Sequence, residues 1–92
     1  MVNHPNRGLP ALPVLADNGP DASVLGFART ETAAMRIAKA HADNNGYDVG
    51  AVGVALQDGI EVTYDPIINT RARADRANAA GRGWVVHWDA AP

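Results

Sequence analysis

Residues 49–64 carry the longest alternating pattern of apolar side chains in the chain, and an Asp58-Gly59 pair interrupts it. An Asp-Gly pair between two alternating runs is typical of a β-hairpin turn. A loop of residues 57–59 with Gly59 left-handed would place the apolar side chains of both strands on one face, and a slip of one residue would undo that. The predicted facing pairs are Leu56 with Ile60, Val54 with Val62 and Val52 with Tyr64.

The opposite face of this predicted hairpin carries only small or polar side chains. One face of the hairpin is therefore expected to join the core. The other is expected to be either solvent-exposed or a surface that another molecule approaches closely. Its members are Gly53, Ala55, Glu61 and Thr63.

The N-terminal residues 1–22 are rich in proline, which forbids a helix and weakens a central strand. We therefore predict an extended arm over residues 1–22, ended by a turn at 18–21. The arm would lie on the domain, be disordered, or dock on a partner or a second protomer. Residues 23–92 would form a single α+β domain. The prolines are Pro5, Pro10, Pro13 and Pro20.

Two helices are predicted after the arm. Residues 30–44 show apolar spacings of three and four, with Thr30 as N-cap and an Asn-Asn-Gly stop. The apolar stripe is mostly alanine, so this helix should pack close to a sheet with Ile37 as its anchor. Residues 71–80 have good helix propensity, a cap at Asn69 or Thr70, and Gly81 at the end. A flexible basic loop is the alternative for this second segment.

Short strands are predicted at residues 23–29 and 84–88, beside those of the hairpin. The resulting order is strand, helix, strand, strand, helix, strand, which is that of the ferredoxin-like fold. We therefore expect an α+β domain with a small antiparallel sheet and one or two helices on one face.

Composition limits the classes of function. The 92 residues carry a net charge of −2 and contain no cysteine, and much of the 47% hydrophobic content is alanine. A core this light would gain from a partner or from homodimerisation. No apolar run approaches the roughly 20 residues needed to cross a membrane, so we expect no membrane partner and a cytoplasmic location.

The side chains that could carry chemistry are scattered. His4, His41 and His87 lie in three different predicted elements, and the only serine, Ser23, lacks the context of a nucleophile. We therefore predict no catalytic residue, no metal site, no cofactor and no enzymatic activity. A small dimeric ferredoxin-like enzyme with a pocket near His87 and Trp88 remains as one alternative.

The arginines give the main prediction of a binding site. Between residues 71 and 82 four arginines accompany one acid, Asp75, for a local charge of +3 that leaves −5 on the rest of the chain. Arginine suits phosphates and carboxylates, so the segment is either a solvated basic face or a contact for nucleic-acid backbone or an acidic protein surface. The candidate binding residues are Arg71, Arg73, Arg76 and Arg82, with Arg36 and Lys39 of the first helix.

Residues 30–38 read TETAAMRIA, a T-x-x-x-A-x-R-I-A pattern between a predicted strand and small antiparallel strands. Over residues 23–64 the chain resembles some phage-encoded anti-CRISPR inhibitors of type I systems. The resemblance implies a non-enzymatic inhibitor that binds a host protein or ribonucleoprotein complex and occludes its surface. A nucleic-acid-binding module that uses the arginine segment is the alternative function.

Overall fold

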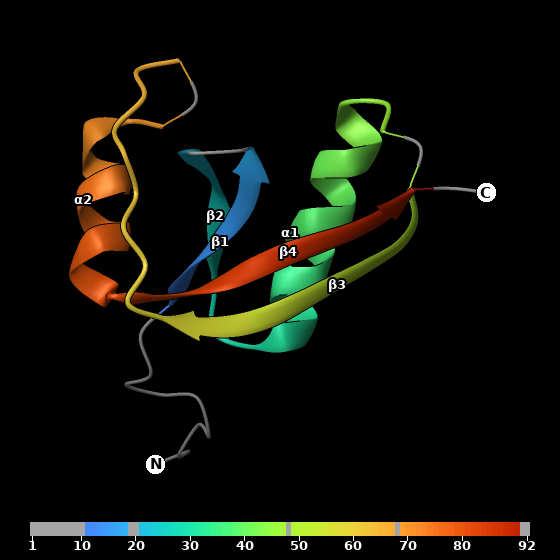
Figure 1. The fold of residues 1–92 in the computed structure, drawn as a ribbon, viewed down its shortest axis with the longest axis horizontal. Coiled ribbons are helices and arrows are strands. Elements are labelled where there is room, and N and C mark those ends of the chain that lie inside the picture. Colours follow the sequence, from blue (N-terminus) through green and yellow to red (C-terminus); the bar gives the residue numbers. More distant parts are fainter. Residues whose placement is uncertain (1–10, 19–20, 48, 68, 91–92) are drawn as a thin grey trace, which may run out of the picture.

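The computed structural model describes residues 11–18, 21–47, 49–67 and 69–90. Within them the elements are β1 (Leu12–Asn18), β2 (Asp21–Ala28), α1 (Glu31–Asn44), β3 (Val49–Asp58), α2 (Arg71–Ala80) and β4 (Arg82–Ala90) (Figure 1). The strands form one sheet in the order β2-β1-β4-β3. β1 and β4 are parallel, and the other two pairs are antiparallel. The predicted α+β class is confirmed.

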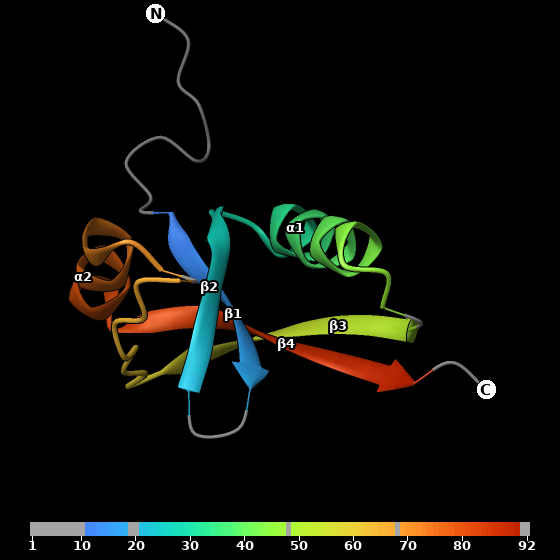
Figure 2. The same cartoon turned by 90° about the horizontal axis from the view of Figure 1, so that it is seen from above.

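The two helices cover opposite faces of the sheet, so the prediction of one shared face is wrong. Val14 of β1 belongs to a buried cluster with Ala38 of α1, whereas Leu15 belongs to a second cluster with Ala77 of α2. Successive strand residues point to opposite faces, which places α1 and α2 on either side of β1. Figure 2 shows the helices on opposite sides of the β1–β2 hairpin.

β1 lies inside the sheet, so the prediction of an arm over residues 1–22 is wrong for its described part. Val14 is fully buried, and β1 pairs with β2 on one side and β4 on the other. The parallel pairing with β4 runs from Val14 to Ala16, after Pro13, so the missing N–H of Pro13 falls outside it. The predicted turn at 18–21 joins β1 to β2, and its central residues lie outside the described ones, as do residues 1–10.

The predicted hairpin of residues 49–64 is not formed. β3 pairs with β4, and the partners of Val52, Val54 and Leu56 are Trp88, Val86 and Trp84. Residues 60–65 form no strand; they cross to the other face of the sheet, where Val62 joins the cluster beside α2. The ferredoxin-like order is therefore wrong, and β1–β4 pairing makes the sheet mixed instead of antiparallel.

Both predicted helices are present with their predicted caps. The hydroxyl of Thr30 accepts a hydrogen bond from the Ala33 N–H, and Thr70 does the same for the Arg73 N–H, both at 3.1 Å. Gly81 ends α2 with φ of 65°, a left-handed conformation that glycine adopts without strain. Residues 71–80 are thus a helix and not a loop.

The alanine stripe of α1 brings the helix close to the sheet, as predicted. Ala34, Ala38 and Ala42 are buried, and a side chain at Gly26 of β2 would come within 3.2 Å of Ile37. Ile37 therefore anchors α1 over β2. The other flank of α1 lies over β3.

Candidate functional site

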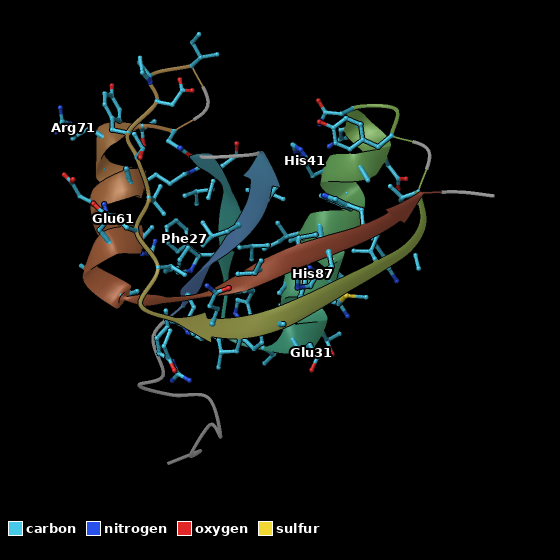
Figure 3. All side chains as sticks on the ribbon, viewed as in Figure 1. Phe27, Glu31, His41, Glu61, Arg71 and His87 are labelled. Carbon is cyan, nitrogen blue, oxygen red and sulfur yellow. The ribbon has the colours of Figure 1, made fainter. Side chains whose placement is uncertain are left out.

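Part of the sheet face opposite α1 is covered by neither helix. On β3 and β4 this region consists of Ala51, Gly53, Ala55 and His87, which we call the open face. Ala51, Ala55 and His87 are exposed, and a Cβ placed on Gly53 would meet no atom within 4 Å. Gly53 and His87 are direct partners in the β3–β4 register. Figure 3 labels His87 in the middle of this strand pair.

A groove of about 270 Å³ adjoins the open face on the same side of the sheet. Its floor is apolar and made by Leu15, Ala22 and Val85. Its wall comes from the end of β3 and the segment that follows: Gln57, Gly59, Ile60 and Glu61. The exposed amide of Gln57 and the exposed carboxylate of Glu61 supply the polar groups. The groove can take an apolar side chain that carries a polar or cationic end.

The wall of the groove is held by backbone contacts that sequence reasoning missed. Gly59 has φ of +70°, and its N–H donates to the Gly81 carbonyl at 2.8 Å. The Val62 N–H donates to Asn78 Oδ1 at 2.7 Å, and Asn78 Nδ2 donates to the Val62 carbonyl at 3.0 Å. The Asn78 side chain thus satisfies both backbone groups of Val62, as a neighbouring strand would. A single asparagine in an alanine-rich helix gives no sequence signal for this role.

Two of the predicted binding arginines stack on aromatic rings. The guanidinium carbon of Arg76 lies 4.1 Å from the centre of the Phe27 ring, and that of Arg71 lies 4.6 Å from the centre of the Tyr64 ring. Such contacts orient the guanidinium plane and contribute about 0.5–1 kcal/mol each at exposed sites. Each aromatic ring covers one face of the guanidinium plane and leaves the in-plane N–H donors of that arginine available for an anion.

The other two arginines of the segment have partners within the fold. Arg73 Nη1 donates to the Val24 carbonyl of β2 at 3.3 Å. Arg82 forms an ion pair with Asp58 at 2.5 Å, where both side chains are at least half exposed. An exposed pair of this kind contributes little to stability. Arg73 therefore links α2 to β2, and Arg82 links β4 to β3.

The six predicted binding residues do not form one surface. Arg71, Arg73 and Arg76 lie on α2, whereas Arg36 and Lys39 are exposed on α1 across the sheet. The exposed acid Asp75 lies on α2 among the arginines. Of the predicted binding residues on α2, Arg71 and Arg76 are exposed, whereas Arg73 is half-buried and donates to the Val24 carbonyl.

The histidines are also separated. His87 lies on the open face, and Trp88 points to the α1 side, so they do not line one pocket. The Trp88 ring lies 6.4 Å from the His41 ring and 6.2 Å from the Tyr47 ring. Ser23 is buried. Among the described side chains, no three of His, Cys, Asp or Glu gather as a metal ion would require, and His4 lies outside that part of the chain.

Neither α1 nor α2, the helices of the described residues, has the length and apolar character to cross a membrane. Comparison with models of known protein families, with curated proteins and with solved structures found no match for this chain. The candidate functional features of the chain are the open face, the adjoining groove and the stacked arginines.

Proposed function

We propose that the chain is a small non-catalytic interaction protein that binds a partner protein or ribonucleoprotein complex through the open face and occludes its surface. The observation that carries this proposal is a stretch of sheet with small, exposed side chains and open space above Gly53. A partner's backbone or flat surface can approach such a face closely. The groove beside it offers a site for one anchoring side chain of the partner.

The resemblance of residues 23–64 to phage anti-CRISPR inhibitors supports a more specific form of the proposal. In that form the partner is a type I CRISPR–Cas surveillance complex of the host, and the chain acts in the host cytoplasm. A complex occupied by the chain would lose access to its nucleic acid or to its nuclease.

Substitution on the open face should abolish partner binding and leave the fold intact. Gly53→Arg fills the open space, and His87→Glu changes a neighbouring position on β4. Because a side chain at either site meets solvent, the free energy of unfolding should fall by no more than about 0.5 kcal/mol. The measurement is inhibition of target-DNA binding by a purified type I surveillance complex, together with affinity capture from host lysate.

Ala40→Arg on the exposed side of α1 is the matched control, because it adds the same side chain on the opposite side of the sheet. We expect it to retain binding. Equal capture by wild type, Gly53→Arg and His87→Glu would reject the open face as the docking surface. A surveillance complex that wild type leaves fully active would reject the anti-CRISPR form.

A nucleic-acid-binding module is the second candidate, and the stacked arginines favour it. Arg71 and Arg76 present oriented N–H donors from the same helix. Each arginine is taken to neutralise one phosphate. The double variant Arg71→Gln with Arg76→Gln should then reduce the slope of the logarithm of the duplex-binding constant against the logarithm of the salt concentration by about 2. Fluorescence anisotropy of labelled DNA and RNA at low and physiological salt measures this. Binding that is insensitive to salt, or equal in the double variant, would contradict the second candidate.

A further inference from the structure

The two edge strands of the sheet, β2 and β3, differ in whether other elements contact their outward-facing backbone groups. At β2, the Val24 N–H donates to the buried Asn69 Oδ1 at 2.9 Å, and the Val24 carbonyl accepts from Arg73. Asn69 and Arg73 therefore satisfy outward-facing backbone groups of that edge. β3 forms the other edge, and no described element pairs with its outer side.

From Ala51 to Gln57 the β3 edge lacks the usual protection against pairing, because the irregularity in its register lies at the start of the strand, between Val49 and Ala51. Exposed edge strands are normally blunted by charges, proline or a bulge, because their free N–H and C=O groups attract another strand. β3 is ten residues long, and residues 49–57 contain neither a charge nor a proline. Leu56 is 43% exposed although it continues the apolar row of Val52 and Val54. This edge has the character of an interface.

We propose that β3 pairs antiparallel with β3 of a second copy of this chain, about a two-fold axis through Val54. The two four-stranded sheets would then form one continuous sheet with both α1 helices on the same face. This proposal goes beyond the proposed function and does not rest on it.

The side chains of β3 select this register. With Val54 opposite its own copy, Leu56 of each chain lies opposite Val52 of the other and becomes covered. Regular pairing then runs from Ala51 to Gln57, and Asp58 lies beside Gly50 at the irregular start of the other strand, so no like charges face each other. Moving the axis to residue 53 would place Leu56 opposite Gly50, and moving it to residue 55 would place Asp58 opposite Val52. The register centred on Val54 buries the most apolar surface.

The charges on α1 are complementary under the same two-fold axis. Ile37 faces β2, so the flank of α1 over β3 carries Glu31, Met35 and Lys39, at spacings of four residues. A two-fold axis perpendicular to the sheet makes the two helices antiparallel. The Glu31 end of each helix then points toward the Lys39 end of the other, and the opposite charges favour a second copy as the occupant of the edge.

Sedimentation equilibrium of the full chain is the first test. We expect wild type to sediment at twice the 9.6 kDa of one chain, and Leu56→Lys to sediment as a folded monomer, with folding checked by circular dichroism. Ile67→Lys is the matched control, because Ile67 is 91% exposed on the loop that leads into α2 and is not part of β3, and it should leave the dimer unchanged. A wild-type monomer up to millimolar concentration, or an undiminished Leu56→Lys dimer, would overturn the proposal.

Crosslinking tests the register. The chain has no cysteine, so Val54→Cys introduces a single thiol that would lie opposite its copy at the two-fold axis. Facing residues of antiparallel strands have Cα atoms about 4.5–5.5 Å apart, which a disulfide can span. Mild oxidation should give a disulfide-linked dimer of Val54→Cys. Ala51→Cys should give none, because residue 51 would lie opposite Gln57. The reverse result, or no crosslink in either variant, would reject this register.

Discussion

Gly83→Ala is expected to lower the free energy of unfolding by about 2 kcal/mol. Gly83 is buried at the start of β4, where a Cβ would lie 2.6 Å from Cδ1 of Ile60 and 3.0 Å from the Pro13 carbonyl oxygen. The Ile60 methyl group can rotate away, but the Pro13 oxygen belongs to the backbone of a central strand. The close approach of β1, β4 and the groove wall therefore depends on glycine at this position.

Urea denaturation followed by tryptophan fluorescence measures this effect. Gly53→Ala is the matched control, since it makes the same change on β3, where a Cβ has open space. Alanine restricts the unfolded chain more than glycine, so the control should gain up to about 0.5–1 kcal/mol. Equal stability of the two variants would contradict the packing shown around Gly83.

The helices could be predicted from the sequence because their signals are local. Thr30 and Thr70 cap helices through residues three positions away, and Gly81 ends α2 through its own backbone conformation. These contacts need no information about the rest of the fold. The strand of residues 84–88 was also evident from its alternating bulky residues.

Strand pairing could not be predicted in this way, because it depends on competition between distant segments. The Asp58-Gly59 signal favours a local hairpin, but Trp84, Val86 and Trp88 offer β3 larger apolar partners than residues 60–64 do. Proline density argued against a strand at residues 12–18, although Pro13 precedes the pairing with β4. A preference for nearby partners therefore gave the wrong element order.

The candidate site was predictable only in its composition. Gly53 and Ala55 indicated a lean face, and that face is open. His87 joins it only because β4 pairs with β3, and Leu15, Ala22 and Val85 meet in the groove only because three strands lie side by side. The charge cluster of residues 71–82 did not predict that Arg76 stacks on Phe27 and Arg71 on Tyr64.

Asn78→Ala is expected to cost about 2 kcal/mol of stability and to release the segment that walls the groove. The change removes both hydrogen bonds to the backbone of Val62, whose side chain is 3% exposed. Leaving buried backbone groups without partners costs about 1–3 kcal/mol, of which the better helix propensity of alanine returns a small part. Hydrogen exchange of the Val62 amide, together with urea denaturation, measures the release.

Asn44→Ala is the matched control, because it makes the same substitution at an exposed position in the last turn of α1. It should leave the Val62 amide protected and change stability by less than about 0.5 kcal/mol. Asn78→Asp keeps the oxygen that accepts from the Val62 N–H and removes the donor to its carbonyl, so its cost should fall between those of the two alanine variants. If Asn78→Ala left the Val62 amide as protected as in wild type, residues 60–64 would be held by side-chain packing alone. The groove wall would then keep its position without the asparagine.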